Sequence, residues 1–204
     1  MRATDDRYRG EQAKFDLAMR MIGHEARTGT IRFLTGLNDD RIRKLYTSYF
    51  KYAEEPVRRQ RGRSPTRIAP LVRTPQRSLE SGVFVNLLLA NDVLCPEQPP
   101  GPPLKHNVDV GQRFCECFEW FDVLVPRSSL SFEWCWNLLV SMRRGDELGI
   151  ARCGVCSICY VFDVLSLPRS ACPAAKISPA AASVRIHSSD LSPERQRSAA
   201  TPTQ

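Results

Sequence analysis

Three cysteines near the C-terminal end of the 204-residue chain are spaced as metal ligands often are. Cys153 and Cys156 are separated by two residues, and Cys172 follows after fifteen more. Two cysteines at the first interval form a tight knuckle whose thiolates can both reach one ion, and zinc prefers four tetrahedral nitrogen or sulfur ligands. The spacing therefore predicts a zinc site that uses Cys153, Cys156 and Cys172.

The fourth ligand of this site is left open by the sequence. Ala175 stands where a second knuckle would carry its second cysteine, while Cys159 follows Cys156 at the same interval and could compensate. His187 is a remoter candidate. Two other interpretations remain: the cysteines pack as small apolar side chains, or Cys153 and Cys156 form a thiol redox pair.

The positive charge of the chain is concentrated in one segment. The net charge is +7, and residues 57–77 carry seven arginines and no acidic residue. An excess gathered in this way is typical of a surface that binds a polyanion, with nucleic acid as the leading class and an anionic membrane surface as the second. Arg58, Arg59, Arg61 and Arg63, around Gly62, suit a flexible arm that follows a DNA backbone or enters a narrow minor groove; a basic linker without a ligand is the alternative.

The N-terminal part has the outline of a helix-turn-helix. Apolar residues recur at helical spacing in residues 15–26, and a short helix is expected in residues 30–37, capped by Thr30 and ended by Gly36. Asn38 should cap a third helix over residues 39–50. Arg41, Arg43 and Lys44 would lie on this recognition helix, where they could reach phosphates or base edges or simply form a solvated face.

The remaining chain predicts a mainly α protein with a small C-terminal zinc-ribbon-like region. Helices are expected in residues 78–95, 110–123 and 131–144, the last capped by Ser128 or Ser129, and a strand near residues 160–165. Cys115, Cys117 and Cys135 lie in aromatic-rich helical patterns and should be core residues. The predicted organisation is a helix-turn-helix-like region (8–55), a basic arm (56–77), a helical core (78–148), a zinc-knuckle region (149–175) and a disordered tail (176–204).

Several functional classes find no support in the sequence. No glycine-rich phosphate loop, nucleophile elbow or paired-histidine metal motif occurs, so we expect a protein that is not an enzyme. The first residues carry alternating acids and bases that do not suit a signal peptide, and the longest apolar run, residues 83–90, is too short to span a bilayer. A cytoplasmic protein without a membrane partner is expected, and its eight cysteines should be free thiols or metal ligands.

Short motifs along residues 10–175 resemble the FlhC family of flagellar transcriptional activators. They are Ala18-Met-Arg-Met-Ile-Gly-His-Glu-Ala-Arg27, Leu34-Thr-Gly-Leu37, Arg41-Ile-Arg-Lys-Leu-Tyr46, Gly111-Gln-Arg-Phe114, Leu130-Ser-Phe-Glu133 and Gly145-Asp-Glu-Leu148 before Cys153. The segment with Arg61-Gly-Arg63 and Pro65 is similar to family members that have a basic linker.

The resemblance implies a mainly helical subunit that binds double-stranded DNA, assembles with an FlhD-like partner into a heterohexamer and activates flagellar operons. The family's four zinc cysteines would fall on Cys153, Cys156, Cys172 and position 175, of which the last is Ala175 here. The alternatives from other classes are a generic zinc-ribbon module for RNA or single strands, a thiol redox protein, and an interaction subunit that does not touch DNA.

Overall fold

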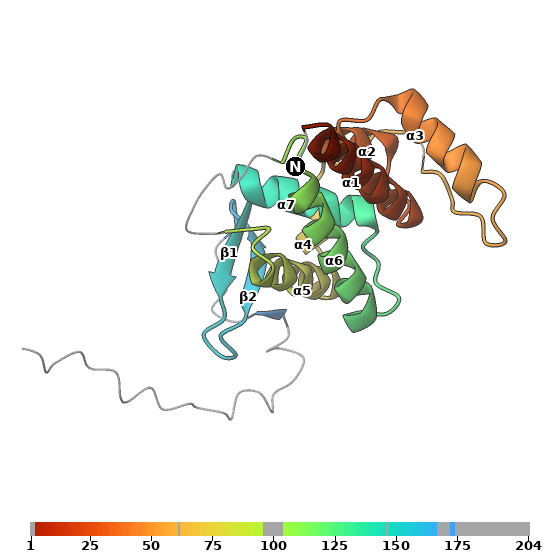
Figure 1. The fold of residues 1–204 in the computed structure, drawn as a ribbon. Helices are drawn as coiled ribbons and strands as arrows, with labels where there is room; N and C mark the ends of the chain where they lie inside the picture. The colour runs from red at the N-terminus through yellow and green to blue at the C-terminus, as the bar shows by residue number, and fades with distance from the viewer. Residues whose placement is uncertain (1–2, 61, 96–103, 146, 167–171, 174–204) are drawn as a thin grey trace, which may run out of the picture.

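A computed structural model of the chain describes residues 3–60, 62–95, 104–145, 147–166 and 172–173 (Figure 1). Its elements in order are α1 (Ala3–Gly23), α2 (Thr28–Thr35), α3 (Asp39–Leu45), the π-helix η1 (Tyr46–Phe50), α4 (Ala69–Val72), α5 (Pro75–Ala90), α6 (Val108–Leu124), α7 (Phe132–Arg144), β1 (Leu148–Arg152) and β2 (Cys159–Asp163). The expectation of a mainly helical fold with a small cysteine-bearing C-terminal region is confirmed. Arg61, Ala175, His187 and the predicted tail lie outside the described residues.

The helix ends follow local chemistry in several places. Asn38 accepts a hydrogen bond from the Arg41 amide and caps α3, and Gly36 ends α2 with a φ of 73°, so both predictions are confirmed. The prediction that Thr30 caps the second helix is wrong, because α2 already begins at Thr28. The predicted third helix also changes form, since its last five residues continue as the π-helix η1.

Two buried glutamates explain why the serine and threonine caps were mispredicted. Glu80 of α5 accepts hydrogen bonds from the hydroxyls of Ser128 and Ser129, so these serines tie the α6–α7 connection to α5 and neither caps α7. Glu133 of α7 accepts a hydrogen bond from the Thr30 hydroxyl, at 3.1 Å, and from the Arg27 amide, at 2.7 Å. A buried carboxylate needs such donors, and here hydroxyl and amide groups supply them.

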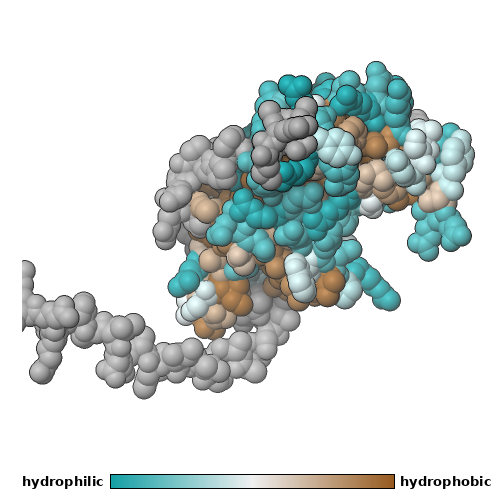
Figure 2. All heavy atoms as spheres, viewed as in Figure 1, coloured by the Kyte–Doolittle hydropathy of each residue, from teal (hydrophilic) through white to brown (hydrophobic). Residues whose placement is uncertain are grey.

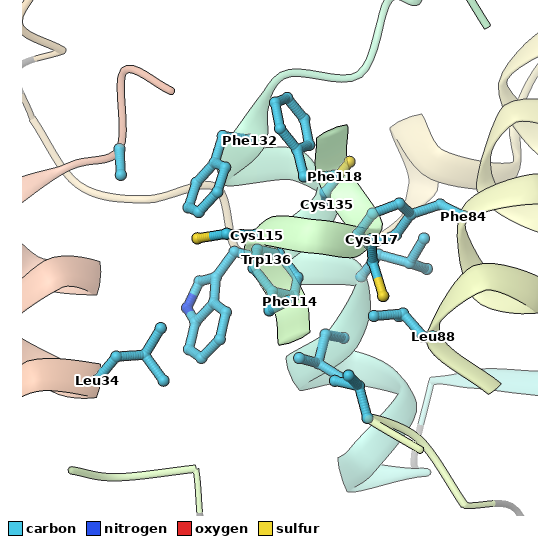
Figure 3. Packing of buried hydrophobic residues seen from close by; sticks show 14 of the residues in the cluster. Leu34, Phe84, Leu88, Phe114, Cys115, Cys117, Phe118, Phe132, Cys135 and Trp136 are labelled. Carbon is cyan, nitrogen blue, oxygen red and sulfur yellow. The ribbon is translucent and has the colours of Figure 1, made fainter. Parts of the chain in front are cut away.

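An aromatic cluster forms the centre of the core (Figure 3). The Phe114 ring on α6 makes edge contacts with the rings of Phe84, Phe132 and Trp136, with centroids 5.2 to 5.6 Å apart. Edge-to-face pairs are the arrangement that aromatic quadrupoles favour. The predicted core positions of Cys115, Cys117 and Cys135 are confirmed, since all three are buried.

A polar cluster joins α1 to α6 at the edge of this core. The Arg20 guanidinium donates to both carboxylate oxygens of Glu119, at 2.7 and 2.6 Å, and His24 Nε2 lies 2.9 Å from the same carboxylate. The hydrogen bonds from Arg20, opposed by burial and helped by His24, lower the pKa of Glu119 to about 2. The cluster therefore favours the ionised carboxylate.

This cluster predicts a pH-dependent contribution to stability. A carboxylate whose pKa is lowered on folding stabilises the fold above its ordinary pKa of 4.5, and this contribution disappears as the pH falls toward 2. We expect Glu119→Gln to be less stable than the parent at neutral pH, with the difference shrinking in acid. Urea unfolding across this range measures it. Glu116→Gln is the control, because Glu116 meets Arg20 only at 3.8 Å; equal pH profiles for Glu119→Gln and the parent would contradict the assignment.

The strands β1 and β2 form an antiparallel hairpin that packs on α5. Gly149 pairs with Phe162, and a Cβ at Gly149 would lie 2.6 Å from the Phe162 ring, so the ring occupies the space that a side chain would take. Asn86 of α5 donates to the carbonyl of Cys159 at 2.7 Å. In Figure 1 the hairpin lies on the opposite side of the molecule from α3. No helix in the described part of the chain is long and apolar enough to cross a membrane.

Candidate functional site

The structure brings three of the four proposed metal ligands together. The ligand atoms of Cys153, Cys156 and Cys172 all lie within 4.8 Å of one another, and the Cys156 and Cys172 sulfurs are 3.5 Å apart. Thiolates bound to one zinc ion at about 2.3 Å would lie roughly 3.8 Å apart. The separations therefore fit a single small metal ion, and a cysteine set with this spacing is compatible with zinc.

The turn between the strands positions the Cys153 and Cys156 thiols, whereas Cys172 lies beyond β2. The Cys153 amide donates to the Ile158 carbonyl and the Ser157 amide donates to the Cys153 carbonyl, which closes the chain into a compact knuckle. The knuckle packs against Tyr160 and Phe162 of β2, so one side of the cluster is apolar.

Backbone amides also favour the ionised form of one ligand. Burial opposes ionisation of the Cys153 thiol, but amide donors from Cys172, Cys156 and Val155 outweigh burial and lower its pKa to about 6. The Cys172 amide approaches the Cys153 sulfur to 3.2 Å and the Val155 amide to 3.4 Å. Because a metal binds the thiolate rather than the thiol, these donors suit a ligand position.

Cys159 does not belong to this cluster, although its spacing made it the nearest candidate for a fourth ligand. Side chains alternate between the faces of a strand, so Cys159 lies on the face of Val161, which packs into the main core. The cluster packs against Tyr160, on the other face. Within the described residues the group of potential ligands thus consists of three cysteines.

The other buried cysteines have no features of reactive thiols. Burial raises the pKa of Cys115 to about 12 and that of Cys117 to about 11, and it raises the pKa of Cys135 well above its ordinary value. Thiols that stay protonated neither bind metal nor attack electrophiles at neutral pH.

The predicted recognition helix places its basic residues on the surface, but two of them already meet acidic groups. Arg41 lies 3.2 Å from Glu11 of α1, and Arg43 lies 3.0 Å from Asp40. Lys44 is exposed. To contact phosphate, Arg41 and Arg43 would therefore have to exchange these carboxylates for it. Glu11, the partner of Arg41, lies on α1, thirty residues earlier in the chain.

The basic arm is attached to the helices rather than free. Residues 57–67, which we call the basic strap, run back from η1 across the start of α2, and the chain after η1 can be followed at the right of Figure 1. Arg58, Arg59 and Arg63 are exposed on it, whereas Arg61 lies outside the described residues. Sequence reasoning missed the residues that hold the strap, Tyr46, Gln60 and Asn137, because no local pattern marks a contact between distant segments.

The surface carries both hydrophilic and apolar regions. On the face seen in Figure 2, hydrophilic residues cover much of the helical part, and apolar residues are visible both near the hairpin and at the α3 end of the molecule. Large apolar side chains are exposed at the end of α6 and in the hairpin turn: Trp120, Val123, Leu124, Val155 and Ile158.

No protein-family model matches this chain, and no curated protein sequence matches it.

Proposed function

We propose that the chain is a DNA-binding transcription regulator of the FlhC type, which works with an FlhD-like partner and uses its cysteine knuckle as a structural zinc site. The observation that carries the proposal is the basic strap, which presents exposed arginines beside the α1–α3 helices. The short motifs that resemble the FlhC family give the proposal its biological context. Duplex DNA is the favoured polyanion because a line of guanidinium groups can follow a phosphate backbone.

The salt dependence of DNA binding tests this proposal. Each phosphate neutralised by an arginine adds close to one unit to the slope of log affinity against log salt concentration. Replacing Arg58, Arg59, Arg61 and Arg63 with alanine should therefore change the slope by roughly 3 to 4. The measurement is a salt titration of binding to duplex DNA.

A matched variant separates local contacts from overall charge. Arg127 and Arg152 are exposed and lie outside the strap. The Arg127→Ala/Arg152→Ala variant lowers the net charge by two but should change the slope by less than about one. An unchanged slope in the strap variant would remove the strap from the DNA interface.

A second candidate function, binding of single-stranded nucleic acid, is favoured by aromatic side chains next to the strap. Tyr49 and Tyr52 are 62% and 79% exposed, and the Lys51 ammonium lies 4.8 Å from the centre of the Tyr52 ring. Exposed rings beside cations can stack on unpaired bases. Binding compared between duplex and single strands of equal length distinguishes the two functions.

A further inference from the structure

The described residues of the basic strap are held to the body of the protein at several points. At its start, the Tyr46 hydroxyl donates to the Val57 carbonyl at 3.0 Å. Further along, the Gln60 amide donates to Glu25 at 2.7 Å. At its far end, Asn137 of α7 donates to the Arg67 carbonyl at 3.2 Å. These contacts recur at short intervals, so no long part of the strap is unattached.

Contacts with α2 hold the middle of the strap. The Arg27 guanidinium, at the N-terminal end of α2, donates to the Arg63 carbonyl, and the hydroxyls of Thr30 and Ser64 are 3.4 Å apart. Gly62 has a φ of 94°, and a Cβ there would lie 3.5 Å from the Arg27 guanidinium. The strap therefore bends at a glycine where it passes this side chain, in a conformation that other residues rarely adopt.

The strap also has two distinct sides. Val57, Gln60, Ser64 and Pro65 are half-buried, whereas four arginines of the strap are exposed: Arg58, Arg59, Arg63 and Arg67. Arg59 is itself oriented, because its guanidinium lies 5.7 Å from the centre of the Tyr46 ring and 3.4 Å from the Thr28 hydroxyl. Small and neutral groups thus face the protein, and the cations face outward.

We propose that the strap is a preorganised anion-binding element, in which contacts with the α1–α2 connection, α2, η1 and α7 hold the arginines in one fixed row along a phosphate backbone. This inference rests on the proposed function for the identity of the polyanion. A docked strap and the flexible arm expected from the sequence should differ in their affinity for the polyanion. A flexible arm loses conformational entropy when it binds, whereas a docked strap has already lost this entropy on folding.

Releasing the strap tests the proposal without changing any of its arginines. Tyr46→Phe removes the hydroxyl that binds Val57, and Gln60→Ala removes the donor to Glu25. In the full-length chain we expect this double variant to be cleaved by trypsin after the strap arginines at least about fivefold faster than the parent, because cleavage follows the population of the open form. Gly62→Ala, which strains the bend and keeps every polar contact, should act in the same direction.

DNA binding supplies the second measurement, with a random-sequence duplex as the probe. The double variant should bind about tenfold more weakly at one salt concentration while its salt slope stays unchanged, because the number of phosphate contacts is the same. Tyr8→Phe is the matched control, since it removes an exposed tyrosine hydroxyl of α1 that takes part in none of these strap contacts, and it should resemble the parent in both measurements.

Either of two results would overturn the proposal: equal cleavage of the parent and the double variant, or tighter DNA binding after release, which would mean that docking hides the arginines. Failure of the proposed function is recognised separately. If alanine at the strap arginines leaves DNA binding unchanged, the strap is not the DNA interface, while the cleavage rates still show whether the strap is docked.

Discussion

Cys172→Ser should remove most of the zinc from a chain that otherwise carries about one ion. Cys172 is buried, and its sulfur lies 3.5 Å from that of Cys156. A serine hydroxyl is a poor substitute for a thiolate, and the site has only three cysteines in the described part of the chain. Since changes outside the ligand set already cost about 10- to 100-fold in affinity, loss of a ligand should cost more than about 100-fold. Metal content of the purified protein and cobalt substitution measure the effect.

Cys159→Ser is the matched control for this prediction. It replaces a half-buried cysteine of β2 that follows Cys156 at the knuckle spacing but lies on the other face of the strand. We expect it to keep the full zinc content. Zinc loss in Cys159→Ser equal to that in Cys172→Ser would contradict the three-cysteine site, as would a parent protein that binds no metal.

Phe114→Ala should cause a large loss of folding stability. The ring is fully buried and contacts three other aromatic rings, so its removal leaves a cavity at the point where α5, α6 and α7 meet. We expect the free energy of unfolding to fall by about 3 to 5 kcal/mol. Urea denaturation, followed by circular dichroism, gives the value.

Trp120→Ala provides the comparison for Phe114→Ala. Trp120 is on the same helix, but its side chain is 59% exposed. Its removal should change the free energy of unfolding by less than about 1 kcal/mol. If both variants lose the same stability, the aromatic cluster is not the centre of the core.

Local signals in the sequence predicted much of this architecture. The helical periodicity, the Asn38 cap and the Gly36 stop depend on residues within a few positions of one another, and they are confirmed. The knuckle of Cys153 and Cys156 is equally local. Such features are fixed by the chain itself, so a single sequence is enough to find them.

The errors arose where a side chain has a distant partner. Ser129 caps no helix because its hydroxyl binds Glu80, forty-nine residues away, and Thr30 caps none because its hydroxyl donates to Glu133, 103 residues away. In both cases tertiary packing outweighed a local capping preference of comparable energy. Cys159 is different: it fits the knuckle spacing, but the alternation of side chains along β2 places it on the other face of the strand.

Because Cys172 lies far along the chain from Cys156, an ion bound to both cysteines would also restrict the unfolded chain. Cys156 and Cys172 are sixteen positions apart, so an ion bound to both would close a loop of that length. By the chain-entropy relation used for disulfides, closing a loop of about 15 residues lowers the entropy of the unfolded ensemble by an amount worth roughly 3 kcal/mol at room temperature. A bound ion would therefore act as a reversible cross-link for the hairpin, a structure of only two strands that is marginally stable alone.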